Sequence, residues 1–220
     1  MSSPTLTDKV SKMIHQDILN GDLHPGQKLV VAELKERYSV GASPIREALV
    51  QLSWNKYVKL QPQKGCWVAA ISSEELKELF EGLSVIGKVL LSKAIKNGNE
   101  AWELSVLTTF HKLSKVNLTE PSLEVMLEWE ERYSAFHSTL LEGANAPIMH
   151  QFHQELTNQI KRYHHLQSNY NEACKEYTDF LKEHESIMKL ALARNEEQAI
   201  ELLEKHYVTT MDLLSGSFEA

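Results

Sequence analysis

Apolar and polar positions in the first 55 residues recur with the period of short amphipathic helices. One such stretch covers residues 7–20 and stops at Gly21, a second covers 31–38, and a third begins at Ser43. Ser43 is expected to cap the third helix, because its hydroxyl can accept a first-turn amide, and Pro44 suits the first helical position. Two short helices joined by a Gly-containing turn fit a helix-turn-helix, although an αα-hairpin in an ordinary helical domain has the same pattern.

Two short strand-like runs follow the third helix. Residues 57–60 and 66–68 flank Pro62–Gly65, which suits a hairpin connection because proline pre-sets φ and glycine supplies positive φ. Three helices followed by a hairpin predict a winged helix-turn-helix rather than an αα-hairpin. In such a module the start of the third helix, the preceding helix and the wing contact DNA. The residues expected there are Ser43, Arg46, Glu47, Lys35, Lys64 and Gly65.

From residue 72 onward the pattern is that of long helices only. Ser72 and Glu75 have the spacing of a capping box, as do Asn195 and Gln198. Helices are expected at 72–96, 100–116, 122–143, 147–169, 172–194 and 196–214. Six amphipathic helices in succession predict an antiparallel bundle. The expected fold is therefore mainly α, with a winged helix-turn-helix DNA-binding domain at 1–71 and an all-α domain at 72–220.

Charge is distributed unevenly along the chain. Residues 1–70 hold nine Lys/Arg and six Asp/Glu, a net charge of +3, whereas the remainder holds 14 and 24, a net charge of −10. The split indicates a modestly basic module attached to an acidic one. The sequence has no apolar run of the roughly 18 residues that a membrane span needs and no apolar signal segment at its start. Its two cysteines lack metal-site spacing, so reduced thiols in a cytoplasmic protein are expected.

Three of the ten histidines lie on the apolar stripes of three different predicted helices. These are His137, His184 and His206. A single histidine on such a stripe is usually a satisfied core residue. Three together each need partners for their ring nitrogens, and one shared divalent metal ion would satisfy all three. Imidazole is a suitable ligand for zinc, nickel, iron and copper.

Three segments resemble the winged-helix domain of GntR-family bacterial transcription regulators: G-D-L-H-P-G-Q-K-L, V-G-A-S-P-I-R-E-A-L-V-Q-L and P-Q-K-G-C-W-V-A. The helical remainder resembles the FCD-type ligand-sensing domain of the FadR subfamily. Many members of that subfamily hold a buried metal with an Asp and three histidines. Phe136-His137, Glu183-His184 and His206 match that motif, while Tyr133 stands at the Asp position. The resemblance thus implies a divalent metal, zinc or nickel, with three histidine ligands and positions open for water or a carboxylate.

The first bundle helix departs from the subfamily pattern. Where the subfamily usually has an Arg and, four residues later, a Glu, this chain has Leu83 and Gly87. This wall of the effector pocket, near Tyr133, is therefore expected to be more apolar and roomier. An anionic effector would depend on the metal and on Arg162 for charge compensation, because an unpaired buried carboxylate is costly. The expected effector is an organic acid that is bulkier or less charged than a simple dicarboxylate.

The resemblance implies a homodimeric, effector-controlled repressor that places two recognition helices on a near-palindromic DNA operator. Two alternatives remain at this point: a regulator that senses the metal itself, and a metalloenzyme built on the three histidines. The sequence contains no H-E-x-x-H, G-x-S-x-G or P-loop motif, and no acid lies one turn from His137 to act as a general base. No catalytic residue is predicted, and an enzyme is not expected.

Overall fold

The computed structural model of the protein describes residues 4–120, 122–164 and 170–216, apart from the side chains of 170–176. The chain divides into two compact units. Unit 1 comprises Met1–Glu75 and Asn158–His165, and unit 2 comprises Leu76–Thr157 and Leu166–Ala220. Helix α7 (Pro147–His164) therefore contributes its last turns to unit 1 and its first turns to unit 2.

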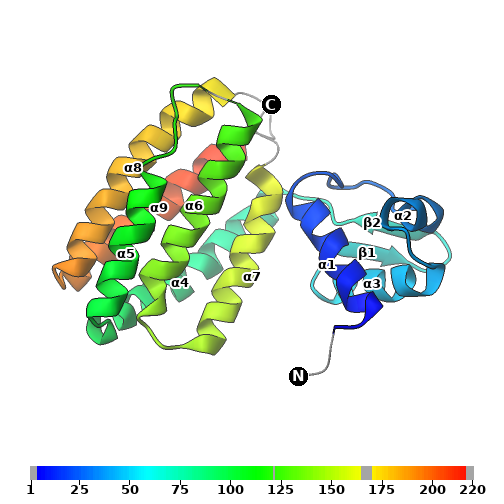
Figure 1. Ribbon diagram of the computed structural model, residues 1–220, viewed down its shortest axis with the longest axis horizontal. Coiled ribbons are helices and arrows are strands. Elements are labelled where there is room, and N and C mark those ends of the chain that lie inside the picture. Colours follow the sequence, from blue (N-terminus) through cyan, green and yellow to red (C-terminus); the bar gives the residue numbers. More distant parts are fainter. Residues whose placement is uncertain (1–3, 121, 165–169, 217–220) are drawn as a thin grey trace. The chain divides into compact units, whose positions relative to one another are not determined.

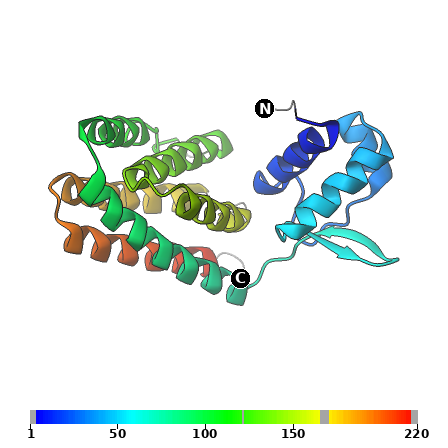
Figure 2. The ribbon, with the colours of Figure 1, turned by 90° about the horizontal axis from the view of Figure 1, so that it is seen from below.

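Unit 1 contains three helices and an antiparallel hairpin (Figure 1). The elements are α1 (Leu6–Leu19), α2 (Val31–Tyr38), α3 (Ala42–Trp54), β1 (Val58–Gln61) and β2 (Gly65–Val68). Each contributes to one buried apolar core, which includes Val10, Ile14, Leu34, Ile45, Leu49, Val58 and Val68. Figure 2 shows the hairpin extending from these helices. The winged helix-turn-helix predicted from the sequence is confirmed.

The hairpin has the connection that its sequence predicts. Val58 pairs with Val68 and Gln61 with Gly65. Gly65 has a φ of 128° and Gln63 a φ of 62°, so the turn uses backbone conformations in which glycine is least strained. The segment before α2 adds to this sheet, because the Leu29 amide donates to the Cys66 carbonyl at 2.8 Å.

The start of α3 differs from the prediction that Ser43 caps it. Gly41 is the N-cap, with an extended backbone at φ −70° and ψ 166°. The Ser43 hydroxyl instead donates to Glu47 Oε1 at 3.0 Å, one turn further along. Pro44 is still tolerated, because the first amides of a helix have no intrahelical partner. The prediction for Ser43 is therefore wrong, and the helix begins at Ala42, two residues before Pro44.

Unit 2 is a helical bundle, as predicted (Figure 1). Its helices are α4 (Ser73–Asn97), α5 (Glu100–Leu113), α6 (Leu123–Glu142), the first turns of α7, α8 (Tyr170–Leu192) and α9 (Glu196–Gly216). α5 packs against α6 and α8, and α8 packs against α9. α4 runs antiparallel to α9, since Lys88 pairs with Glu204 at 2.5 Å and Lys96 with Glu196 at 2.8 Å. None of the described helices is long and apolar enough to cross a membrane.

The predicted capping box at the start of α4 forms with a substitute partner. The Ser72 hydroxyl accepts the Glu75 amide at 3.1 Å, as expected. The Ser72 amide, however, donates to the Tyr163 hydroxyl at 3.3 Å, and that hydroxyl donates to the Glu75 carboxylate at 2.6 Å. In a capping box the Glu75 carboxylate would accept the Ser72 amide directly. Here the Tyr163 hydroxyl of α7 takes that place and links the two groups.

Candidate metal centre and nucleic-acid interface

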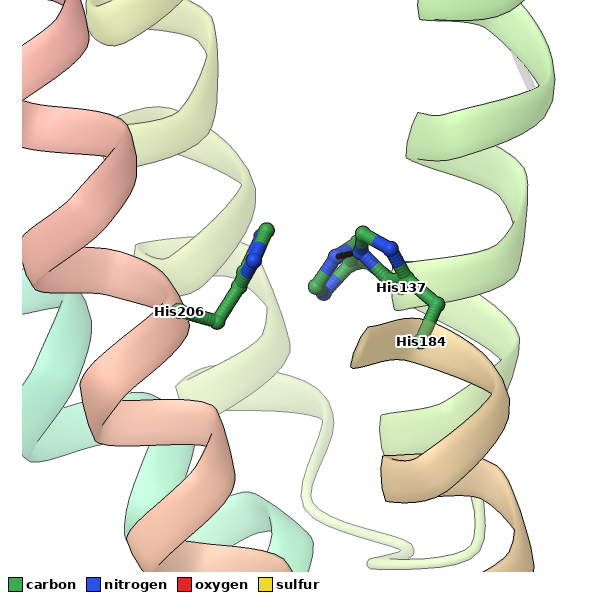
Figure 3. Close-up of side chains that lie close together, drawn as sticks. All are labelled: His137, His184 and His206. Carbon is green, nitrogen blue, oxygen red and sulfur yellow. Dashed lines mark hydrogen bonds between the residues drawn. The ribbon is translucent and has the colours of Figure 1, made fainter. Parts of the chain in front are cut away.

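Helices α6, α8 and α9 bring the three predicted histidines together inside unit 2. His137 is 6% exposed, and His184 and His206 are fully buried. One ring nitrogen from each lies within 4.8 Å of the others. Figure 3 shows the three imidazoles directed toward one another from the three helices. The helical stripes in the sequence therefore identified a cluster with the composition of a metal site.

Groups of the protein itself fix the outer nitrogens of two of these rings. His206 Nδ1 lies 3.1 Å from Glu183 Oε2, so Nδ1 carries the proton and donates to the carboxylate. His184 Nδ1 faces the Phe180 carbonyl oxygen and donates to it. Each ring therefore presents an unprotonated Nε2 to the centre of the cluster. Such support of the distal nitrogen is typical of histidines that bind metal ions.

The inner nitrogens are paired with one another or with Tyr133. His137 Nε2 lies 2.7 Å from His184 Nε2, and since the latter is unprotonated, His137 Nε2–H donates. The Tyr133 hydroxyl donates to His206 Nε2 at 2.8 Å. The Nε2 atoms of His137 and His184 are thus about as close as neighbouring ligands of one ion, about 3 Å for bonds of about 2.0–2.1 Å.

Burial holds His137 and His184 neutral. The pKa values of His137 and His184 lie well below the ordinary 6.5, first because burial disfavours the charged form and then because other imidazoles are close. Burial also raises the pKa of Tyr133, so its phenol stays protonated. Neutral imidazole is the form that binds a metal, and three histidines with converging ring nitrogens fit a divalent ion such as zinc or nickel.

A second buried polar pair lies beside the cluster. His153 of α7 is 8% exposed, and its Nε2 lies 3.4 Å from the hydroxyl of Tyr207 on α9. Burial, and then the nearby His150, lower the pKa of His153 to about 4. Sequence reasoning missed this pair. The signal was present, because His153 lies on the stripe of α7 that includes Leu156 and Ile160 at helical spacing.

The wall formed by α4 is apolar but not roomier. Leu83 is 5% exposed, and Gly87 is also buried. A Cβ at Gly87 would lie 2.8 Å from the Tyr207 hydroxyl oxygen and 3.0 Å from the ring carbon Cε2. The prediction of extra room at Gly87 is therefore wrong, because the side chain of Tyr207 fills the space that glycine leaves.

Arg162 is held by contacts within unit 1. Arg162 belongs to unit 1, whereas the cluster belongs to unit 2. Its buried guanidinium donates to the carbonyl oxygens of Ala69 and Ala70, at 3.0 and 2.8 Å, and to Gln159. These contacts fix the segment that follows the wing.

The residues predicted to contact DNA are exposed in unit 1. Arg46 projects from the first turns of α3, Lys35 from α2, and Lys64 and Gly65 lie at the wing turn. A concave region of about 320 Å³ lies between α2 and the start of α3 and is lined by Ala32, Lys35, Glu36, Ser39, Val40 and Gly41. Free amides and the positive end of the helix dipole at the start of α3 favour an anion there.

Two predicted contact residues also have roles within unit 1. The Glu47 carboxylate accepts hydrogen bonds from Thr7 at 2.8 Å and from Ser43 at 3.0 Å, which ties the start of α1 to α3. Lys28, which was not predicted, lies with its ammonium group 5.8 Å from the centre of the Trp67 ring on β2. It adds a cation to the wing.

Comparisons with known proteins agree with this arrangement. Residues 6–68 match the model of bacterial regulatory proteins of the gntR family, and residues 78–209 match the FCD domain. The HTH-type transcriptional repressor GlaR of Escherichia coli K12 is 31% identical, over 92% of this chain and 93% of its own. The HTH-type transcriptional regulator BphR of Paraburkholderia xenovorans LB400 is 27% identical, over 96% and 85%. The structure of E. coli McbR/YncC has the same fold, with a TM-score of 0.79 at 17% identity over 98% of this chain and all of that one.

A winged helix-turn-helix followed by a bundle with a buried histidine cluster defines a DNA-binding transcription regulator with an effector-binding domain. The chain belongs to the GntR family, with an FCD domain of the FadR subfamily. Because this is a family of transcription regulators, the protein is not an enzyme, and the alternative of a tri-histidine metalloenzyme is excluded.

The buried neutral histidines predict acid sensitivity of the metal-free protein. The unfolded chain takes up protons below pH 6.5, whereas folded His153 does so only near its pKa of about 4, so the free energy of unfolding should fall as the pH is lowered from 6.5 toward 4. His153→Gln should reduce this fall by roughly 2–3 kcal/mol. Chemical denaturation at several pH values measures it, and an equal fall in both proteins would contradict the burial of a neutral His153.

The contact between Gly87 and Tyr207 predicts a steric penalty. Gly87→Ala should destabilise the protein by about 1–3 kcal/mol, and Tyr207→Phe should relieve part of it by removing the nearest atom. Gly82→Ala is the matched control, because its Cβ would meet only the flexible end of Leu156 at 3.3 Å. Thermal denaturation of the variants compares them. Equal stabilisation by both alanines, as helix propensity alone would give, would show that Tyr207 does not fill this space.

Proposed function

We propose that the protein is a cytoplasmic, homodimeric repressor whose helical domain, residues 72–220, controls operator binding by the winged-helix domain, residues 1–71. The observation that carries the proposal is the conjunction of an exposed, basic recognition face in unit 1 with a buried cluster of three histidines in unit 2. The 31% identity to GlaR, a transcriptional repressor by name, supports repression rather than activation.

The DNA contacts follow from the exposed face of unit 1. The start of α3 enters a major groove, where Arg46 contacts a phosphate or a base edge and Ser43 and Glu47 lie nearby. Lys35 and the first amides of α3 surround the concave region and contact a backbone phosphate. Lys64 and Gly65 of the wing contact the flanking backbone or minor groove. Two copies of the chain read the two halves of a near-palindromic operator.

The proposed metal is a divalent ion, zinc or nickel, held by Nε2 of His137, His184 and His206. It would replace the present pairings of these nitrogens, releasing the Tyr133 hydroxyl from His206. When bound, the ion supplies a Lewis-acidic centre with a position for a carboxylate. Glu183 and the Phe180 carbonyl keep two of the rings oriented. A regulator that senses the metal itself has the same ligands and is the second candidate.

The proposed effector is an organic acid with one carboxylate at the metal. Leu83 offers no hydrogen bond, Arg162 is engaged in unit 1, and Tyr207 fills the space beside Gly87. A second carboxylate would find no cation among these residues, and an unpaired buried charge is costly. The Tyr133 hydroxyl and the pair His153–Tyr207 are the polar groups available to a ligand. The effector is therefore less charged than a dicarboxylate.

Sequence-specific binding should depend on Arg46. Arg46→Ala should weaken binding to the protein's own promoter region by on the order of 1–3 kcal/mol, because a charged contact in the groove is lost. Lys205→Ala, an exposed change on α9, should have no effect. Fluorescence anisotropy with labelled duplexes at one salt concentration measures both. Equal affinity of the unaltered protein for promoter and random duplex would refute the DNA-binding assignment.

Metal content should depend on each histidine of the cluster. His137→Gln, His184→Gln and His206→Gln should each lower both the metal content and the melting temperature of gently purified protein, because a metal bound only by the native state stabilises it. His111→Gln, at an exposed position of α5, is the control. Elemental analysis that finds no metal, and no uptake of added zinc or nickel, would contradict the proposal.

Effector binding should require the metal. Monocarboxylic acids should raise the melting temperature of the metal-loaded protein, and a chelator should abolish this increase. Dicarboxylic acids of equal chain length should raise it less. Differential scanning fluorimetry with and without chelator tests this. Tight, metal-independent binding of a small dicarboxylate would overturn it, and a response to metal alone would favour the metal-sensing candidate.

A further inference from the structure

We infer that α4 forms the dimer interface by packing antiparallel against α4 of a second copy, with the two-fold axis at the level of Gly87. The inference rests on the proposed homodimer and adds the surface and register to it. It follows from the exposed side of α4, which carries an acidic first half, an apolar centre and a basic last half.

Exposed apolar side chains gather at the centre of this surface. Val85 is 61% exposed and Val89 40% exposed on α4. α7 lies beside α4, since a Cβ at Gly82 would touch Leu156 at 3.3 Å. On α7, Phe152 and Ile148 follow at intervals of one turn from Leu156 and are 59% and 71% exposed. Val85 and Val89 of α4 and Ile148 and Phe152 of α7 are thus exposed apolar side chains on two neighbouring helices, and a concentration of such side chains marks an interaction surface.

Charged residues flank the apolar centre symmetrically. Glu78 and Glu81 are exposed before it, and Lys93 and Lys96 are exposed after it. Three pairs of residues are placed symmetrically in the sequence about Gly87: Glu81 with Lys93, Glu78 with Lys96, and Val85 with Val89. An antiparallel two-fold pairing centred there places each acid opposite a lysine of the second copy, and Val85 opposite Val89. A two-fold interface must be self-complementary in this way, and antiparallel helix dipoles also favour it.

Contacts within the chain leave Glu81 and Lys93 available for such pairing. Lys96 is already bonded to Glu196, but among the described residues neither Glu81 nor Lys93 has an ion-pair or hydrogen-bond partner. A competing apolar surface on α5 carries Leu104 and Leu107, 59% and 44% exposed. Its nearby acid Glu103 is paired with Arg194 of the same chain, so this acid is already engaged.

A charge-swap cycle tests this register. Glu81→Lys should place lysine opposite Lys93 of the second copy and raise the dimer dissociation constant at least about tenfold, and Lys93→Glu should do the same through two acids. The double variant restores opposite charges and should return the constant to within about threefold of the original. The two substituted residues of one chain cannot form this ion pair with each other, because they are about 18 Å apart along the helix. Any rescue in the double variant therefore comes from contacts between the two copies.

Sedimentation equilibrium of the full chain, without DNA or added ligand, measures these constants. Val85→Asp should yield a folded monomer with unchanged helical circular dichroism, whereas Leu104→Asp on α5, equally exposed, should remain dimeric. Unchanged constants in both single variants, a double variant weaker than either, or loss of the dimer on Leu104→Asp would overturn the inference. This experiment contains no DNA, so it tests the interface independently of DNA binding. A protein that dimerises as expected but does not bind its promoter would refute the proposed function and leave this interface in place.

Discussion

The need to satisfy six ring nitrogens of three buried histidines is the constraint on which the centre of the bundle depends. An imidazole deprived of hydrogen bonds inside a protein costs several kcal/mol. The chain partners five of these nitrogens from its own groups, with Glu183 and the Phe180 carbonyl on the outer side, and Tyr133 and the His137–His184 contact on the inner side. These polar contacts therefore fix the positions of α6, α8 and α9 along the bundle axis. The inner contacts are the ones that a metal would replace, so a bound metal would act directly on the packing of three helices.

Periodicity made much of this arrangement predictable from the sequence. A helix has 3.6 residues per turn, so a histidine among apolar residues at that spacing must face the core, whatever the details of packing. His137, His184 and His206 followed from this rule, and His153 obeys it equally. The partners of the rings did not follow. Whether Glu183 reaches His206 depends on how α8 and α9 are shifted relative to each other along the bundle axis. The sequence of either helix alone does not specify this shift.

The two errors have the same physical origin. Ser43 has the composition of a cap, but a carboxylate one turn away competes for its hydroxyl, and Gly41 adopts the cap conformation at no steric cost. Gly87 suggested open space, but Tyr207, distant in sequence, fills it. Local chemistry sets what a residue can do. The choice among its options is made by neighbours that only the fold brings near.

The central claim is that the converging nitrogens of the three histidines hold one metal ion. Anomalous diffraction at the metal absorption edge, from crystals of the full chain grown with nickel or zinc, addresses this directly. It should give a single strong peak inside the bundle, about 2.0–2.2 Å from Nε2 of His137, His184 and His206, with the Tyr133 hydroxyl no longer bonded to His206. If crystals grown with excess metal give no peak there, and His137 Nε2 is still paired with His184 Nε2, the claim of a metal site is contradicted.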